Sequence, residues 1–380
     1  MAASVIIPAT QAAVKISGPS SVGLSTASAL PVLDPLEVLV RVAAVSINQV
    51  DGKSADMSPS PGATSGVDFS GIVVQLGADV KTDKFRANNN MKLVELGDRV
   101  FGGVFGNNPL RLDNGAFAEY TAVPARLVWH VPANMDLTTA STIGATLATV
   151  GLALFNYLQL PMPSTVSSDS KTATSIEGRP AVLVYGGGTS TGAMAIQVLK
   201  IAGFNPITTC SPASSERAMH FGATATFDYH SPKCGADVRE YIGDSLALAL
   251  DCISDTASMS TCYEALGPAG GRYVALDAFP LRGHTRRSVV PDWVCTYTQF
   301  GHPVAWAPPY NLDARPHDRE FAEAWYVVAQ RLLDEGRIEP YPKEERRGGL
   351  AAVEDGIKEV WKGEVKGVKL VYPIIIKLLY

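Results

Sequence analysis

The stretch "AVLVYGGGTSTGAMAIQVLK" (Ala181–Lys200) decides the fold of the second half of the chain. Its first five residues form an apolar run typical of a strand buried on both faces. The run "AMAIQVLKIAG" after it has the spacing of a helix that stops at Gly203. Three glycines and three hydroxyl residues follow the strand, and a fourth glycine, Gly192, comes directly before the helical run. This layout predicts a phosphate-binding turn, because backbone N–H groups at a helix start carry partial positive charge and bind anions.

Strands and helices alternate after this stretch. Further strands are expected at 205–211, 225–229, 246–253 and 271–279, and a helix at 214–223 lies between the first two. Alternation of this kind indicates an α/β domain with a doubly wound parallel sheet.

The first third of the chain is instead rich in short strands that glycine, proline and asparagine separate. They are expected at Glu37–Asn48, Gly66–Gly77, Asp98–Gly106 and Gly115–Pro124. Met57–Ser65 and Thr82–Glu95 are predicted to be surface loops. A helical stretch follows at Thr138–Leu158.

The Ser/Thr-rich span Pro161–Pro180 has almost nothing to bury, and we interpret it as a solvated connection between domains. We therefore expect a β-rich domain from residues 1–155 and 306–380, and a cofactor domain from 156–305. In the helix expected at Arg319–Gly336, the apolar face is predicted to be core. The end of the chain, residues 373–380, is expected to be a buried last strand or a frayed tail.

Composition excludes several classes of function. The 380 residues carry a net charge of −5, and no basic cluster suggests nucleic acid or an anionic membrane. No apolar run is judged to reach the roughly 18–20 residues of a membrane helix. The five cysteines have no C-x-x-C spacing, which favours reduced thiols. A cytoplasmic protein is predicted.

The residues after the second strand favour one dinucleotide. The G-x-G-x-x-G spacing fits Gly187, Thr189 and Gly192 if threonine replaces the middle glycine. NAD sites usually place an acid at the end of the second strand, whereas Thr208–Arg217 has none before Glu216. Its serines and arginine suit the 2′-phosphate of NADPH. Alternatively, these residues only cap the next helix, as Ser214 could.

At this point the chain resembles the medium-chain dehydrogenase/reductases, on the quinone-reductase side of that superfamily. The matching pieces include "VLVRVAAVSINQVDGK", "GDRVFG", "GAFAEYTAVP", "YGGGTSTGAMAIQ" and "KGEVKGVKLVY". More narrowly, "TTCSPA", "LDCISD", "DWV" and "WAPPY" are similar to the trans-acting enoyl reductases of fungal polyketide and PKS-NRPS pathways, of the lovastatin-pathway type. The resemblance implies a GroES-like β-rich catalytic domain and a Rossmann cofactor domain.

Zinc-dependent members of that superfamily have a G-H-E motif and a cysteine where this chain reads "GVDFSG" and "SINQVDGK". Because tetrahedral zinc needs Cys, His or carboxylate ligands brought together, no metal site is expected. Hydride addition from NADPH to an α,β-unsaturated thioester then remains, and it needs a stabilised enolate and a proton.

The resemblance also implies roles for individual residues. Lys53, Asp51 and Thr149 would be the catalytic residues. Since no tyrosine follows "VDGK", the proton donor stays open between Lys53, a ribose hydroxyl relay and water. Lys53 could also be an ordinary surface lysine. The cofactor would be bound by Val50, Asp51, Gly52, Lys53, Gly187, Gly188, Thr189, Ser190, Thr191, Gly192, Cys210, Ser211, Pro212, Ala213, Arg217, Tyr229, Ala275, Leu276, Gly367 and Val368, with Lys369 closing over it. The substrate channel would be lined by Ala145, Thr146, Leu147, Ala148, Thr149, Val150, Gly151, Thr298, Gln299, Phe300, Gly301 and His302.

Three functions are compared. The first is NADPH-dependent reduction, in trans, of a polyketide bound to the carrier protein of a polyketide synthase or PKS-NRPS megasynthase, by a monomer. The second is a free-standing, zinc-independent quinone or enone reductase. The third is an NADPH-binding protein without turnover, which retention of Lys53 and a complete cofactor loop disfavours.

Overall fold

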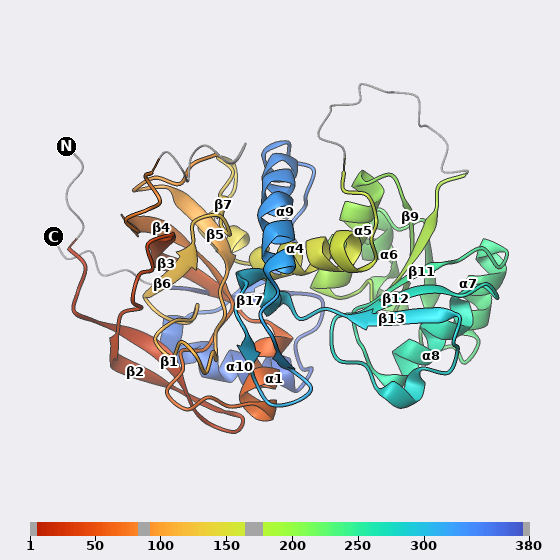
Figure 1. Cartoon of the computed structure of the whole chain (residues 1–380). Coiled ribbons are helices and arrows are strands. Elements are labelled where there is room, and N and C mark those ends of the chain that lie inside the picture. Colours follow the sequence, from red (N-terminus) through yellow and green to blue (C-terminus); the bar gives the residue numbers. More distant parts are fainter. Residues whose placement is uncertain (1–5, 83–91, 164–177, 375–380) are drawn as a thin grey trace. The chain divides into compact units, whose positions relative to one another are not determined.

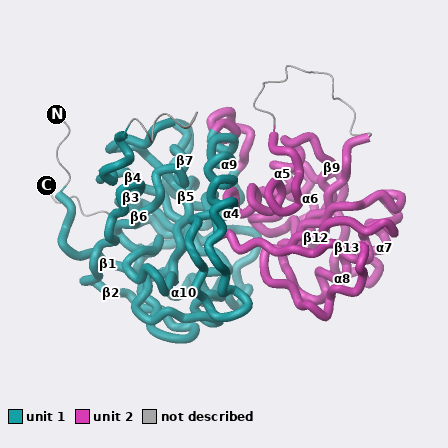
Figure 2. Tube along the Cα trace, in the orientation of Figure 1, with its two compact units in different colours: residues 1–145, 297–330, 340–380 teal, residues 146–296, 331–339 magenta. Residues whose placement is uncertain are grey.

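The computed structural model describes residues 6–82, 92–163 and 178–374, and contacts divide the chain into two compact units. Unit 1 comprises residues 1–145, 297–330 and 340–380, and unit 2 comprises 146–296 and 331–339 (Figure 2). The changes at 145/146 and 296/297 come earlier in the chain than the seams expected at 155 and 305, and residues 331–339, expected in the β-rich domain, belong to unit 2. The first change lies inside a continuous helix instead of in the Ser/Thr-rich span, of which residues 164–177 lie outside the described part.

Unit 2 contains a six-stranded parallel sheet (Figure 1). Its strands are β8 (Ala181–Tyr185), β9 (Asn205–Cys210), β10 (Ala225–Asp228), β11 (Leu248–Asp251), β12 (Gly271–Ala275) and β13 (Val289–Trp293). They are ordered β10-β9-β8-β11-β12-β13, so the strand order reverses between β8 and β11. This is the doubly wound Rossmann order, and the prediction for this half of the chain is confirmed.

The helices of unit 2 are α5 (Ser190–Ile201), α6 (Pro212–His220), α7 (Cys234–Ile242) and α8 (Thr256–Ala265). The sequence interpretation named the first two and missed α7 and α8. Their end signals are nevertheless present, because Asp255 and Ser258 form a capping box at α8 and Gly243 closes α7 in the left-handed conformation. Met259 and Val238 pack from these helices onto the sheet core.

Unit 1 is built on a mixed sheet. In chain order its strands are β3 (Glu37–Ser46), β4 (Asp68–Leu76), β5 (Arg99–Gly103), β6 (Tyr120–Pro124), β7 (Trp129–His130), β16 (Lys343–Glu345) and β17 (Lys369–Pro373). The order is β16-β17-β3-β4-β5-β7, and β6 pairs with β3 beside this path. A hairpin of β1 (Thr10–Gly18) and β2 (Ser21–Ala29) completes the β-rich unit, and the GroES-like expectation is confirmed.

The helices of unit 1 close around this sheet. Helix α1 (Gln49–Met57) packs against α10 (Val353–Trp361) so closely that a Cβ on Gly52 would lie 2.8 Å from the Cβ of Trp361. Helix α9 (Pro316–Asp334) buries Trp325 and Tyr326, as expected for a core face, and the Tyr326 ring stacks on Trp129 with centroids 3.7 Å apart. The remaining short elements are β14 (Val304–Ala305), β15 (Asn311–Leu312), η2 (Leu281–Gly283), η3 (Thr296–Phe300) and η4 (Gly349–Ala352).

The expected helix at 138–158 consists of α3 (Leu137–Ala140), a turn, α4 (Gly144–Gly151) and the π-helical turn η1 (Leu152–Tyr157). By length and composition alone, Leu137–Tyr157 could cross a membrane, so the expectation that no apolar run reaches that length was wrong. In the structure 72% of its apolar window is buried, as in the core helix of a folded protein. Among the described residues it is the one helix that is long and apolar enough.

Some loop predictions need correction or fall outside the described residues. The expected surface loop Met57–Ser65 is partly buried, because Ala63 and Ser65 form backbone hydrogen bonds with β1 and Ser60 bonds to Asn107. Of the loop Thr82–Glu95, residues 83–91 lie outside the described part, as do residues 375–380 of the chain end. Within the described part, that end forms β17 and the buried Ile374.

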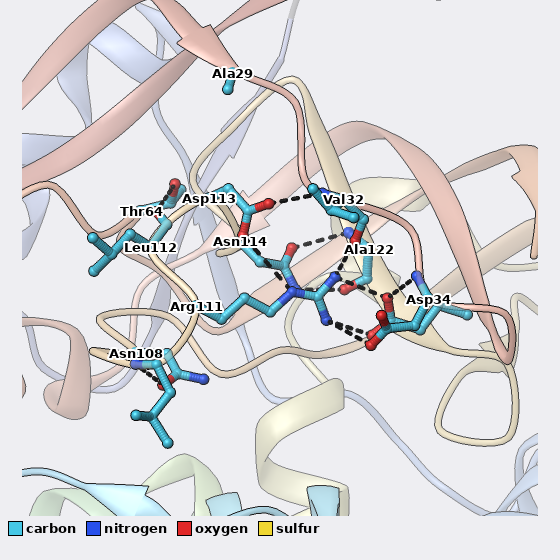
Figure 3. Close-up of polar contacts among 12 residues, drawn as sticks. Ala29, Val32, Asp34, Thr64, Asn108, Arg111, Leu112, Asp113, Asn114 and Ala122 are labelled. Carbon is cyan, nitrogen blue, oxygen red and sulfur yellow. Dashed lines mark hydrogen bonds and ion pairs between the residues drawn. The ribbon is translucent and has the colours of Figure 1, made fainter.

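A cluster of charged groups ties two loops of unit 1 together (Figure 3). The Arg111 guanidinium donates to both carboxylate oxygens of Glu37, at 2.6 and 2.8 Å, and to the carbonyl of Val32 at 2.6 Å. Asp113 accepts the Val32 N–H at 2.7 Å. These groups satisfy one another, so the cluster holds the loop before β3 against the loop of residues 107–114 and is structural.

Candidate functional site

The glycine turn of unit 2 brings backbone close to backbone. Gly186 has a positive φ of 92°, and a Cβ on Gly192 would collide with the carbonyl of Gly186. A Cβ on Gly187 would collide with the side chain of Thr208 on β9. Only glycine fits at Gly187 and Gly192, and the turn leads directly into the twelve-residue helix α5. The arrangement fits a dinucleotide diphosphate, since such a turn lets phosphate oxygens approach the first N–H groups of the helix.

The three hydroxyl residues of this turn divide into two roles. Thr189 is the N-cap of α5: its hydroxyl accepts the Gly192 N–H at 3.0 Å and donates to the Gly186 carbonyl at 2.8 Å. Its hydrogen is therefore engaged within the turn, and its first task is to shape the backbone. Ser190 and Thr191 are half-buried and lie in the first turn of α5, where a phosphate oxygen would be bound.

The end of β9 gathers polar groups beside the turn. Ser211 is the N-cap residue of α6, its hydroxyl lies 3.3 Å from that of Ser214, and the Arg217 guanidinium donates to Ser214 at 3.4 Å. A Cβ on Gly188 would lie 2.9 Å from the Ser214 hydroxyl, so turn and cluster adjoin. The first acid of this segment, Glu216, is exposed on α6.

The other predicted cofactor residues of unit 2 follow the same edge of the sheet. Tyr229 comes after β10, is 42% exposed and lies 6.3 Å from the Tyr185 ring, centroid to centroid. Ala275 is buried at the end of β12, and the N–H of Leu276 bonds to the Asp251 carbonyl. Within the segment 210–213, Cys210 is buried and Pro212 and Ala213 are exposed. Ligands of doubly wound sheets bind at this carboxyl edge.

In unit 1, Asp51 lies in the first turn of α1, the helix that carries Lys53. Its carboxylate accepts the Asn48 N–H at 2.7 Å, which is one half of a capping box; in the other half the Asn48 side chain accepts the Asp51 N–H. Burial raises the pKa of Asp51 to about 8; the Asn48 N–H opposes this shift in part, and the charge of Asp68 adds to it. The predicted residue is therefore a buried cap, while its neighbour Val50 is half-buried.

Behind α1 lies a buried polar cluster that the sequence interpretation missed. Asp68 is fully buried and accepts from Ser46 at 3.2 Å and from Asn48 at 2.9 Å. It also accepts the Ala145 N–H at 2.6 Å and the Lys369 ammonium at 2.7 Å. Lys369 donates to Asn48 as well, at 2.9 Å. We call Ser46, Asn48, Asp68 and Lys369 the Asp68 cluster. The only signal in the sequence was an acid inside the apolar strand pattern of "GVDFSG".

The side chain of Lys53 is partly withdrawn from water. Burial lowers the pKa of Lys53 to about 8, and its Nζ lies 5.2 Å from the centroid of the Tyr310 ring, in cation–π range. Tyr310 ends the "WAPPY" stretch. A lysine with this pKa can give up a proton near neutral pH, which an exposed lysine does poorly.

The predicted substrate residues lie mostly in the core. Thr149 is half-buried and its hydroxyl lies 2.8 Å from that of Thr296. Ala145 is half-buried, while Thr146, Leu147, Ala148, Val150 and Gly151 are buried. Thr298 and Gln299 are buried and bond to Asp318 and Tyr326 of α9. Phe300 and Gly301 are half-buried and His302 is exposed.

At the chain end, Gly367 and Val368 are half-buried before β17. Lys369, expected to close over a cofactor with them, has its ammonium in the Asp68 cluster and is only 5% exposed. Residues 6–82, 92–163 and 178–374 contain no group of three or more His, Cys, Asp or Glu side chains that could hold a metal ion.

Comparisons with known proteins agree with this architecture. Residues 34–133 match the family "Alcohol dehydrogenase GroES-like domain", and residues 190–285 match "Zinc-binding dehydrogenase". Among solved structures, an alcohol dehydrogenase superfamily protein from Novosphingobium aromaticivorans has a TM-score of 0.72 at 20% identity, over 96% of this chain and 100% of that one. The CurK enoyl reductase has a TM-score of 0.70 at 13% identity, over 96% and 100%. These likenesses show the fold.

Sequence relatives are much closer. Trans-enoyl reductase iliB from Neonectria sp. (strain DH2) is 74% identical over 98% of this chain and 99% of the relative. Trans-enoyl reductase iccB from Talaromyces variabilis is 69% identical over 97% of each chain. Trans-enoyl reductase fumoC from Cordyceps fumosorosea (strain ARSEF 2679) is 57% identical over 99% and 96%.

Proposed function

Because the chain belongs to the fungal trans-enoyl reductases of the medium-chain dehydrogenase/reductase family, we propose that it reduces a polyketide's α,β double bond with NADPH. The substrate would be a thioester on the carrier protein of a polyketide synthase or PKS-NRPS megasynthase, and the reductase would act on it in trans, as a separate polypeptide. The observation that carries this proposal is the near full-length identity of 74% to such a reductase. We further propose a cytoplasmic monomer.

The choice of NADPH is supported by the groups at the end of β9. Ser211, Ser214 and Arg217 lie together there, beside the glycine turn. A 2′-phosphate would gain from the guanidinium and the hydroxyls, whereas a carboxylate at this place would repel it. The bound nucleotide would supply a hydride to the β-carbon of the substrate.

Catalysis without zinc is supported by what the carboxylates of unit 1 already do. Asp68 faces the Lys369 ammonium and three further donors, and Asp51 caps α1. Since a metal ligand must offer a lone pair to the ion, these carboxylates would have to abandon buried hydrogen bonds first.

The proton at the α-carbon would come from Lys53 in our proposal. The ammonium of Lys53 is partly desolvated and held over the Tyr310 ring, and its pKa of about 8 leaves most of it protonated at neutral pH. It could therefore donate a hydrogen bond to the enolate oxygen and then transfer a proton to the α-carbon. A relay through a ribose hydroxyl or water is the alternative, and it would leave kcat insensitive to loss of the amine.

The test is oxidation of NADPH by the purified protein with a crotonyl-pantetheine thioester, compared with a simple quinone. We expect turnover of the thioester and little of the quinone. Preference for the quinone would instead favour a free-standing quinone reductase. Tight NADPH binding with turnover of neither compound would indicate a binding protein without catalysis.

A further inference from the structure

A basic segment of unit 2 has no part in the candidate site. Residues 281–290, "LRGHTRRSVV", cover the later part of the connection from β12 to β13 and the first two residues of β13, and they contain three arginines and a histidine without an acid. We call them the basic ridge. The chain as a whole carries a net charge of −5, so this segment has the opposite sign to the rest of the protein.

One arginine anchors the basic ridge to the end of a helix. The Arg286 guanidinium donates to the carbonyls of Tyr263, Leu266 and Gly267, at 2.5, 2.8 and 2.6 Å. These carbonyls belong to the last turn of α8 and the residues after it. They lack partners within the helix and sit at its negative end, so a cation is favoured there.

Two further contacts hold the start of the basic ridge on the same helix. Gly283 of η2 lies against Met259, since a Cβ there would be 2.6 Å from the methionine sulfur. The buried Tyr263 hydroxyl lies 2.9 Å from Nδ1 of His284. Val289 is buried where β13 begins. The basic ridge is therefore a built surface with fixed ends.

The remaining side chains of the basic ridge face solvent. Leu281 is 83% exposed and Val290 58% exposed, and Arg282 and Arg287 are exposed too. Within the part of the chain that the structure describes, neither of these two arginines forms an ion pair. Exposed leucine and valine beside unpaired arginines match the composition of protein interfaces, in which arginine and apolar side chains are enriched.

We infer that the basic ridge is the docking surface for the carrier domain that presents the thioester, an inference that rests on the proposed function. The occupant follows from charge. A carrier-bound thioester hangs from phosphopantetheine, whose phosphodiester is an anion attached directly to the carrier surface. Arg282 and Arg287 attract that anionic face, while the net negative charge of the rest of the protein repels it. Opposed charges of this kind orient a partner and raise its association rate.

The experiment combines two readouts on the full chain: the Kd for the crotonyl-loaded carrier domain of the partner synthase, and turnover of two substrates. In the R282E/R287E variant we expect the Kd and the kcat/KM for the carrier-bound substrate to worsen about tenfold or more. With crotonyl-pantetheine, which lacks the carrier and its phosphodiester, kcat/KM should stay within about twofold. The wild-type kcat/KM with the carrier should fall as salt rises, and the variant should lose this dependence.

Controls separate this inference from the proposed function. R337E places one Arg→Glu change, half the charge change of R282E/R287E, at an exposed arginine of unit 2, and it should leave kcat/KM for both substrates unchanged. R282K/R287K keeps the charge and should keep most of the affinity, while L281S should weaken carrier binding alone. Unchanged carrier binding in R282E/R287E, or an equal loss with both substrates, would overturn the inference. If the wild type left crotonyl-pantetheine unreduced, the proposed function would fail, independently of the Kd measurement.

Discussion

The glycine turn of unit 2 and the Asp68 cluster of unit 1 are assembled in different ways. In the turn, the groups proposed to bind a diphosphate are backbone N–H groups of residues 186–192, which are adjacent in the chain, and glycines there allow two backbone segments to approach closely. In the cluster, Asp68 and Lys369 are separated by 301 positions and meet only because β17 and β4 both pair with β3. The first feature can be recognised in a sequence, whereas the second exists only after folding.

The largest expected effect is on the cluster. Lys369→Met removes the ammonium from a fully buried carboxylate, which should cost about 3–5 kcal/mol of the free energy of unfolding. Urea denaturation measures it. The double variant Asp68→Asn, Lys369→Met should recover part of the loss, because it leaves no uncompensated charge. A single variant as stable as wild type would show that the cluster is not held by its ion pair.

The turn should be sensitive to a single methyl group. Gly192→Ala places a Cβ against the Gly186 carbonyl, and displacing that backbone should weaken NADPH binding by about 2–3 kcal/mol. Fluorescence titration with NADPH measures this. Gly23→Ala is the matched control, since its Cβ would meet nothing within 4 Å. If the wild type, Gly192→Ala and Gly23→Ala bound NADPH equally well, close backbone contact in the glycine turn would not be needed for binding.

A charge at the end of β9 should reduce affinity for the 2′-phosphate. Ser211→Asp keeps a good N-cap for α6 but brings a carboxylate to the proposed phosphate, and should cost about 1–3 kcal/mol of NADPH binding. Ser211→Asn is the neutral control of nearly the same shape and should bind almost normally. Isothermal calorimetry with NADPH and NADH compares the two. If NADPH affinity persists in Ser211→Asp, the phosphate lies elsewhere.

The smallest effect concerns Lys53 and pH. Burial lowers the pKa of Lys53 from 10.5 to about 8, so between these values the unfolded chain holds a proton that the folded chain has released. Stability should therefore rise with pH through this window, by no more than about 1–2 kcal/mol after solvent screening, and below pH 8 Lys53 adds no pH dependence.

Lys53→Met should abolish that rise in urea titrations carried out across the window. It should also lower kcat with crotonyl-pantetheine, whereas the wild-type kcat should decline as pH passes about 8 and the ammonium is lost. Wild-type kcat that ignores pH across this window, together with full activity of the variant, would assign the proton to a ribose relay or to water.

Much of the fold could be predicted because its signals are local. Apolar runs, glycine stops and strand–helix alternation predicted the parallel sheet of unit 2, and short β-branched runs predicted β3, β4, β5 and β6 of unit 1, but not the β1–β2 hairpin. The errors came where tertiary contacts override composition. Polar Met57–Ser65 suggested a surface loop, yet Ser60 and Ser65 are buried through hydrogen bonds to distant backbone. The expectation that no apolar run reaches membrane length overlooked Leu137–Tyr157, whose apolar residues are mostly buried in the fold.

The helix start that can hold a diphosphate, the lack of an acid at the end of β9, and the family can all be recognised from short runs of neighbouring residues. By contrast, the burial of Asp51 as a cap, the pairing of Lys369 with Asp68, and the place of Lys53 over Tyr310 with a lowered pKa depend on how the chain folds. Charge states and pairings of this kind depend on desolvation and on which distant groups meet. Neither is specified by residue type or spacing alone.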